Sequence, residues 1–174
     1  MQKHKHDHDG SCLKNGNAAE AAFAKTAESL GYRPEKAAFG FNVRHVDFFL
    51  WKGDELAYKA DVKARKRLSR SAEGVQDELC FVEVKSGKLG WPSWLDGDAD
   101  VIAFEREHDF IVTPRLELKK MVFRLCDLTK FVSKSSDCLY KAYRRWTKPD
   151  ELLTLVKFDD IISEIDVELW RKSV

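Results

Sequence analysis

The 174-residue sequence contains no long apolar run, and this absence excludes several classes of protein. No stretch approaches the ~20 apolar residues of a transmembrane helix, and the polar N-terminal segment has no hydrophobic signal-peptide core. The sequence also lacks internal repeats, a P-loop, a dinucleotide-binding fingerprint, a Gly-x-Ser-x-Gly elbow and a zinc quartet. We therefore expect a cytoplasmic protein that does not associate with membranes.

Cysteine is scarce, and charge of neither sign is in excess. Cys12, Cys80, Cys126 and Cys138 show no metal-binding spacing, and Cys80 lies in an apolar strand pattern, which favours reduced thiols over disulfides. The net charge is +1, so the overall charge gives no argument for a nucleic-acid partner. With 44% hydrophobic and 34% charged residues, the composition is typical of a soluble globular domain with a substantial core.

Two segments of the chain differ in character. Residues 1–16 are polar and rich in His and Asp, which predicts a disordered tail, and the same alternation is typical of part of an expression tag. Residues 17–174 are expected to form a single domain. At its start, Asn17 and Glu20 have the spacing of a capping box, and Gly31 follows the last position of the predicted helix.

The pattern after this helix predicts an α/β (α+β) fold. Alternating or apolar runs between short turns predict strands near residues 38–43, 45–51, 55–63, 79–85, 100–104 and 109–112. Pro114 indicates the start of a further helix. Residues 138–158 are expected to form a C-terminal hairpin, followed by a terminal helix that extends to Leu169.

Two carboxylates and a lysine lie in the second and third predicted strands. The strand period of two places Asp61 and Lys63 on one face, with Val62 on the other. The short link at residues 52–55 is turn-like, so the strands are expected to pair and to bring Asp47 beside Asp61. Two close carboxylates repel each other unless a cation lies between them, and hard oxygen ligands suit Mg²⁺ or Mn²⁺. A lysine beside this cation would orient a water molecule or stabilise negative charge on a phosphate.

This order of a helix, a hairpin carrying Asp and Asp-x-Lys, and further strands resembles the PD-(D/E)xK nucleases, the restriction-endonuclease-like superfamily. Val46-Asp47 stands where the family has Pro-Asp, and Asp61-Val62-Lys63 matches its Asp/Glu-x-Lys. The likeness covers residues 15–113, and Gly90-Trp91 with the Asp-Val-Ile-Ala-Phe-Glu run is similar to a set of phage and bacterial nuclease-like proteins. It implies a restriction-endonuclease-like core with a mixed central sheet flanked by helices. It also implies a Mg²⁺- or Mn²⁺-dependent deoxyribonuclease in a bacterium or phage-infected cell.

The resemblance also implies roles for particular residues. Asp47 and Asp61 would bind the metal ion, with the Val62 carbonyl as a further ligand, and Lys63 would act in catalysis. The family often completes its site with an upstream helical glutamate that binds metal, and Glu20 occupies such a position. A glutamate in a first helical turn also stabilises a helix through capping and the helix dipole, so capping is an alternative role for Glu20.

A second Glu-x-Lys motif leaves a second assignment, or frame, of the catalytic residues open. Glu83 and Lys85 lie in the predicted strand at 79–85, and Asp61 would then be the leading aspartate. The Asp47 frame agrees better with the family's element order. In that frame Glu83 would neighbour Asp61 across the sheet, as an outer ligand or hydrogen-bond acceptor. A surface ion pair between Glu83 and Lys85 is the simplest alternative.

Basic residues around the hairpin and in the C-terminal hairpin would hold DNA phosphates, although a solvated loop or strand edge has the same composition. The candidates are Lys59, Arg65, Lys66, Arg67, Arg70, Arg144 and Arg145. A homodimer is expected if the enzyme cuts both DNA strands. The alternatives are a catalytically inactive nucleic-acid-binding protein of the same fold and a nuclease that acts on RNA.

Overall fold

The computed structural model describes residues 11–68, 74–145 and 148–172, and these ranges contain both helices and strands. The helical segments are α1 (Ser11–Ser29), α2 (Phe39–Asn42), α3 (Arg115–Leu125), α4 (Phe158–Glu164) and the 3₁₀ turns η1 (Trp94–Asp96) and η2 (Ser135–Asp137). The strands are β1 (Arg33–Lys36), β2 (Phe48–Lys52), β3 (Glu55–Lys63), β4 (Leu79–Lys85), β5 (Val101–Glu105), β6 (Asp109–Pro114), β7 (Asp127–Val132), β8 (Lys141–Arg145), β9 (Lys148–Lys157) and β10 (Glu168–Arg171). The expected α/β (α+β) class is confirmed.

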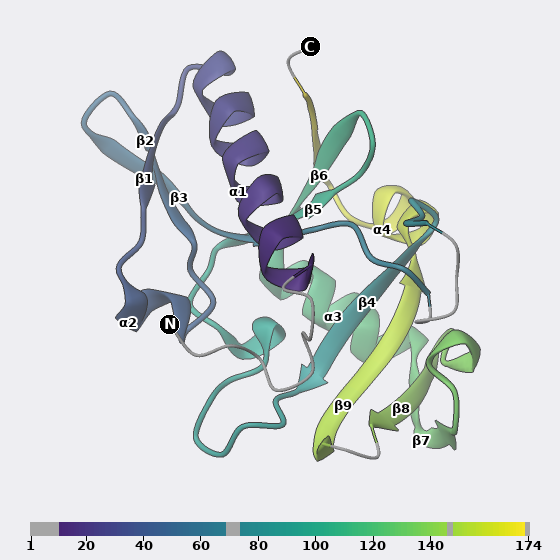
Figure 1. Cartoon of the computed structure of the whole chain (residues 1–174). Helices are drawn as coiled ribbons and strands as arrows, with labels where there is room; N and C mark the ends of the chain where they lie inside the picture. The colour runs from purple at the N-terminus through teal and green to yellow at the C-terminus, as the bar shows by residue number, and fades with distance from the viewer. Residues whose placement is uncertain (1–10, 69–73, 146–147, 173–174) are drawn as a thin grey trace.

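The strands form two mixed sheets (Figure 1). The six-stranded sheet has the order β1-β2-β3-β5-β6-β10, in which β3 and β5 run parallel and the other neighbours antiparallel. The four-stranded sheet has the order β4-β9-β8-β7, in which β7 and β8 run parallel. The sequence predicted one central sheet. The structure has two because β4 pairs with the C-terminal strand β9 and not with β3 or β5.

Helix α1 covers one face of the six-stranded sheet (Figure 1). Phe23 belongs to α1, and its side chain is fully buried between the helix and the sheet. Its ring stacks on that of Trp170 of β10, with 5.5 Å between the ring centres, and forms an edge contact with Phe110 of β6 at 5.3 Å. The small side chains of Ala19 and Ala27 on the same helical stripe are also buried, which lets the helix approach the strands closely. The contacts of this stripe anchor α1 to strands from both halves of the chain.

The opposite face of the six-stranded sheet packs against β4, β9, α3 and α4. Ile102 and Phe104 of β5 belong to this second core, together with Cys80 and Val82 of β4. The intervening β5 residue Ala103 belongs to the α1 core instead. Strand alternation therefore decides which of the two cores each side chain enters.

The predicted hairpin of β2 and β3 is confirmed. Lys52 pairs with Glu55, and the two-residue turn between them has Gly53 at φ 62°, a conformation that glycine adopts without strain. At the other end Phe48 pairs with Ala60, so Asp47 lies just before the first paired residue of β2. The expected strand at 45–51 therefore begins three positions later, at Phe48.

Alternation along β3 orients the candidate residues. Ala60 and Val62 are buried in the core beneath α1. Asp61 and Lys63 alternate with them, so these two side chains lie on the other face, towards β4 and η1. The predicted shared face of Asp61 and Lys63 agrees with this arrangement.

Several boundaries differ from the sequence expectations. Helix α1 begins at Ser11, so Asn17 lies inside the helix and the prediction that it caps the N-terminus is wrong. A strand was expected at 38–43, but α2 occupies residues 39–42 because the chain must reverse there for β1 to pair antiparallel with β2. The expected terminal helix stops at Glu164, because the chain beyond it forms β10 at the edge of the six-stranded sheet.

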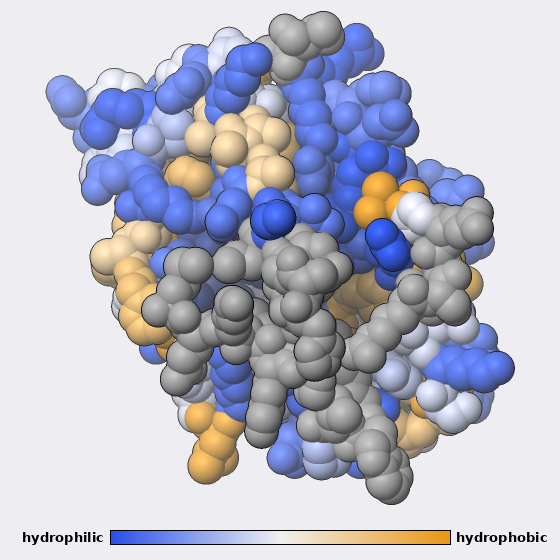
Figure 2. All heavy atoms as spheres, in the orientation of Figure 1, coloured by the Kyte–Doolittle hydropathy of each residue, from blue (hydrophilic) through white to orange (hydrophobic). Residues whose placement is uncertain are grey.

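In Figure 2 hydrophilic residues predominate, and apolar residues form small separate patches. Large exposed apolar side chains lie on separate elements, such as Phe39 on α2, Leu89 after β4 and Phe123 on α3. Within the described ranges, no helix combines the length and the apolar character needed to cross a membrane.

We expect Phe23→Ala to lower the free energy of unfolding by about 3–5 kcal/mol, because it removes a fully buried ring from the α1 core. The matched control is Phe39→Ala, since that ring is 79% exposed, and its expected effect is within about 0.5 kcal/mol. Urea unfolding followed by tryptophan fluorescence measures both values. Equal losses in the two variants would contradict the described packing of α1.

Candidate active site

Asp47 is held in place by backbone and side-chain donors. Its own amide donates to the Ala60 carbonyl at 2.8 Å, which continues the pairing with β3 beyond the end of β2. The Val62 amide donates to Asp47 Oδ2 at 2.9 Å, and Asn42 Nδ2 donates to Asp47 Oδ1 at 3.1 Å. The half-buried carboxylate is therefore oriented before any ligand arrives. Val62, expected to contribute its carbonyl to a metal ion, is seen to contribute its amide to Asp47.

Asp61 has an unusual environment for a carboxylate. It is only 2% exposed; its Oδ1 accepts a hydrogen bond from Lys63 Nζ at 2.7 Å, and its buried Oδ2 has no hydrogen-bond partner in the described chain. Burial and the nearby Asp47 raise the pKa of Asp61, Lys63 opposes the increase, and the resulting pKa is about 7. The predicted convergence of Asp47, Asp61 and Lys63 is thus present in the structure.

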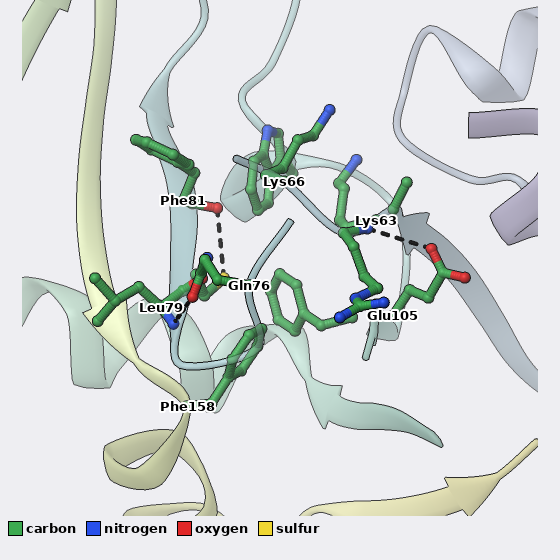
Figure 3. A pocket seen from close by; sticks show the side chains of 12 residues that line it. Lys63, Lys66, Gln76, Leu79, Phe81, Glu105 and Phe158 are labelled. Atoms are coloured by element: carbon green, nitrogen blue, oxygen red, sulfur yellow. Dashed lines mark hydrogen bonds between the residues drawn. The ribbon is translucent and has the colours of Figure 1, made fainter. Parts of the chain in front are cut away.

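Lys63 connects the carboxylates to a small pocket. Its side chain is 20% exposed, and its ammonium group lies 4.8 Å from the centre of the Trp94 ring. Figure 3 shows Lys63 and Lys66 at one side of this pocket and the apolar side chains of Phe81 and Phe158 at the other. The space measures about 50 Å³, which is too small for a nucleotide. This small pocket is therefore not a substrate-binding pocket.

His45 is a site residue to which the sequence pattern assigned no role. Its Nδ1 lies 3.9 Å from Asp61 Oδ2, and its Nε2 lies 3.0 Å from the Pro92 carbonyl oxygen. Burial, and then the charge of Lys63, lower the pKa of His45 to about 4, so the imidazole is neutral at physiological pH. The one signal in the sequence was the position of His45 two residues before Asp47.

Glu20 is not brought together with the other candidates by any described contact. Its carboxylate forms an ion pair with Lys36, whose ammonium group also lies 4.7 Å from the Phe48 ring on the α1 side of the sheet. Asp61 points to the opposite side. The capping alternative is also wrong, because α1 begins at Ser11 and Glu20 lies in the middle of the helix.

Glu83 and Lys85 lie on a different sheet from Asp61. They alternate with Cys80, Val82 and Val84, which face the core between the two sheets, so their side chains lie on the other face of β4. The expectation that Glu83 neighbours Asp61 across one sheet is wrong, because β4 pairs with β9. This arrangement favours the frame led by Asp47.

The basic candidates differ in their surroundings. Arg65 donates to Asp77 at 2.7 Å, and Lys59 lies 3.5 Å from Asp100, so both have acidic partners. Arg67 is exposed after the end of β3, near the exposed Lys66. Arg144 lies over the Phe131 ring at 4.4 Å. Arg70 and the side chain of Arg145 lie outside the described residues.

A larger hollow adjoins the site. It measures about 360 Å³ and is lined mainly by residues 84–93, with Asp96 and Asp150. Lys88 lies 4.0 Å from the centre of the Trp91 ring, which is 38% exposed. The charge of Lys88 also contributes to lowering the pKa of His45, after burial and Lys63, so this cation lies within electrostatic reach of the site. Neither Lys88 nor the hollow was expected from the sequence.

Comparison with known proteins provides no relative. No protein-family model, curated protein or solved structure matches the chain. Among the described residues, no group of three or more His, Cys, Asp or Glu side chains is placed to hold a metal ion. The function must therefore be argued from the geometry of Asp47, Asp61, Lys63 and their neighbours.

We expect Asp61→Asn to stabilise the fold at neutral pH by up to a few kcal/mol, because it removes a buried carboxylate that must ionise. The folded-state pKa of about 7 exceeds the unfolded value, so the folded protein binds more protons and loses stability as pH rises from about 4 to about 7. The difference between variant and wild type should therefore grow across this range and be small at pH 4. Urea unfolding without divalent ions measures it.

Asp54→Asn is the matched control, because Asp54 is exposed in the hairpin turn. Its unfolding free energy should differ from that of the wild type by less than about 0.5 kcal/mol at every pH. A gap between Asp61→Asn and wild type that does not vary with pH would contradict the raised pKa of Asp61.

Proposed function

We propose that the protein is a divalent-metal-dependent nuclease that hydrolyses phosphodiester bonds in DNA. The observation that carries the proposal is the buried Asp61 carboxylate, whose Oδ2 has no described hydrogen-bond partner although Asp47 and Lys63 lie beside it. A buried, unpaired acceptor next to a second carboxylate is unfavourable unless a proton or a cation lies against it. A catalytic metal ion supplies that cation.

The donor set fits Mg²⁺ or Mn²⁺. Both ions prefer carboxylate oxygens and keep several water molecules, so two protein carboxylates suffice to hold them. Asp61 Oδ2 is available, and Asp47 is oriented by Asn42 and Val62 while each of its oxygens keeps a further lone pair. When bound, such an ion polarises the scissile phosphate and lowers the pKa of a coordinated water molecule.

Lys63 is the candidate for charge stabilisation. Its ammonium group is anchored by Asp61 Oδ1 at 2.7 Å and lies beside the Trp94 ring, so it is held near the carboxylates and remains partly exposed. A cation in this position can orient the attacking water or stabilise negative charge on the phosphate oxygens. Either role acts mainly in the transition state and not in DNA binding.

The DNA backbone is proposed to pass over the cations that surround the site. Arg67 is exposed beyond the end of β3, and Lys88 lines the hollow together with Pro92. The hollow of about 360 Å³ is large enough for part of a nucleotide, and the exposed Trp91 ring beside it offers a stacking surface. Arg65 and Lys59 are less suited to this role because they have acidic partners.

A nucleic-acid-binding protein without catalytic activity is the second candidate. The formed ion pair between Asp61 and Lys63 favours it, because such a pair can serve the fold alone. A titration with Mn²⁺ separates the two candidates. The nuclease binds the ion and loses this binding in Asp61→Asn, whereas the binding protein has no use for a metal ion.

We expect Lys63→Ala to reduce cleavage of supercoiled DNA by about 100-fold or more in the presence of Mg²⁺ or Mn²⁺, since it removes a transition-state contact. DNA affinity should change by less than about threefold, because one cation among several contributes little to binding. Parallel reactions on labelled DNA and RNA, each repeated with EDTA, identify the substrate and the metal requirement.

Lys25→Ala is the control, because Lys25 is exposed on α1, on the other side of the sheet. Its cleavage rate should equal that of the wild type. Unchanged cleavage in Lys63→Ala would remove Lys63 from the mechanism, and wild-type protein without divalent-dependent cleavage of DNA or RNA would refute the nuclease proposal.

We expect Arg67→Ala to weaken DNA binding about equally for all sequences and to reduce the slope of log affinity against log salt by about one, as for a single phosphate contact. Its melting temperature should stay unchanged because the side chain is exposed. Arg65→Ala should instead destabilise the fold, since it removes the ion pair with the part-buried Asp77. Fluorescence anisotropy at several salt concentrations and thermal melting measure the two effects.

Arg33→Ala is the matched control, because Arg33 is exposed on β1 near the turn end of the hairpin. It should leave both DNA affinity and the salt slope unchanged. Identical slopes for Arg67→Ala and Arg33→Ala would mean that DNA does not pass over Arg67.

A further inference from the structure

Two hydrogen-bond acceptors face each other in the site. His45 Nε2 lies 3.0 Å from the Pro92 carbonyl oxygen, and because a carbonyl only accepts, the ring proton sits on Nε2 and Nδ1 keeps its lone pair. This lone pair lies 3.9 Å from Asp61 Oδ2, which is too far for a hydrogen bond. Asp61 Oδ2 is buried and has no partner among the described residues. Asp61 Oδ2 therefore has no described donor or cation, and the lone pair of His45 Nδ1 does not supply one.

An ion pair does not explain this arrangement. The 3.9 Å between Nδ1 and Oδ2 is longer than a hydrogen bond, so the ring does not supply the proton that Asp61 Oδ2 lacks. A buried carboxylate oxygen in this position is unfavourable unless a proton or a cation lies against it. One cation that contacts both atoms satisfies them together.

The distance suits a shared metal ion. Bonds from a divalent ion to nitrogen or oxygen are about 2.0–2.2 Å long, so two of its ligands lie about 3 Å apart at a right angle and about 4.2 Å apart when opposite. The observed 3.9 Å lies inside this range. Because no group of three His, Cys, Asp or Glu side chains among the described residues is placed to hold a metal ion, binding requires side-chain rotations that bring both atoms to one ion.

We propose that His45, through Nδ1, is a third protein ligand of the ion held by Asp47 and Asp61, and that the site therefore prefers Mn²⁺ to Mg²⁺. The inference rests on the metal site of the proposed function and specifies its ligands and its metal. Imidazole nitrogen suits transition-metal ions, whereas Mg²⁺ takes oxygen ligands and water.

The backbone around His45 holds the ring in this position. His45 has φ 59°, a left-handed conformation that is uncommon for a residue other than glycine. Gly97 packs directly against it, because a Cβ at Gly97 would lie 2.8 Å from His45 Cβ and 2.7 Å from the Arg44 carbonyl oxygen. An ion pair between Arg44 and Asp98 joins the same two segments. The Pro92 carbonyl then orients the ring as outer partners orient metal-binding histidines.

A packing histidine is the competing explanation. In that case His45 only joins the turn before β2 to the loop around Pro92, and its Nδ1 binds no ligand. The two explanations differ in whether nitrogen coordinates bound Mn²⁺, and pulsed electron paramagnetic resonance detects this directly through coupling to ¹⁴N. The protein for this experiment is the full chain with His4, His6 and His8 replaced by Ala, because tail histidines also bind transition metals.

In this background His45 and His108 are the remaining histidines. We expect ¹⁴N coupling to bound Mn²⁺ that persists in His108→Gln, the exposed control, and disappears in His45→Gln. Calorimetry should show that His45→Gln weakens Mn²⁺ binding about 10-fold or more, while Mg²⁺ affinity changes less than about threefold. Asp61→Asn should lose both ions.

Bound Mn²⁺ without nitrogen coupling would overturn ligation by His45 while leaving the metal site of the proposed function intact. Equal Mn²⁺ affinities for the background protein and a folded His45→Gln variant would do the same. The coupling is measured with His45 present, so this test holds even where the variant fails to fold. Failure of the background protein to bind Mn²⁺ at all would overturn both the ligand assignment and the nuclease proposal.

Discussion

The position of β3 between β2 and β5 is the constraint on which the site depends. Pairing of Phe48 with Ala60 brings Asp47 level with Asp61, and the Val62 amide then binds the Asp47 carboxylate at 2.9 Å. A shift of this register by one residue would turn Asp61 and Lys63 towards α1 and expose the apolar side chains of the neighbouring positions. The same hydrophobic alternation that buries β3 against α1 therefore also aims the acidic and basic groups at the other core.

The buried Asp61 carboxylate is unfavourable for the stability of the fold but suits it for binding a ligand. A fold selected for stability alone would not leave a carboxylate oxygen buried and without a donor, because desolvation of an ionised group is unfavourable. Within the described part of the chain Asp61 has such an oxygen, and burial and Asp47 raise its pKa to about 7. Unfavourable groups of this kind cluster at functional sites, where a ligand offsets the loss. The proposed metal ion would offset the cost of burying the Asp61 carboxylate, and the proposed His45 ligand would help to hold that ion.

The loop between β4 and β5 supplies several of the groups that surround the site. It supplies the Pro92 carbonyl to His45, the Trp94 ring beside Lys63, and Gly97, whose missing side chain lets the loop approach the turn before β2. Lys88 and Trp91 lie in the same loop and border the larger hollow. The β2–β3 hairpin thus supplies the acidic and basic side chains of the site, and the loop between β4 and β5 supplies the groups that surround them.

Local sequence patterns determined the hairpin, because a period of two and a glycine-containing turn suffice to pair adjacent strands and to place Asp61 with Lys63. They also determined β4 and the hairpin of β8 and β9. They did not determine that β4 pairs with β9, that Glu20 binds Lys36, or that His45 faces Asp61. Only the tertiary structure decided these, because each depends on contacts between residues or backbone segments whose mutual position no local periodicity encodes.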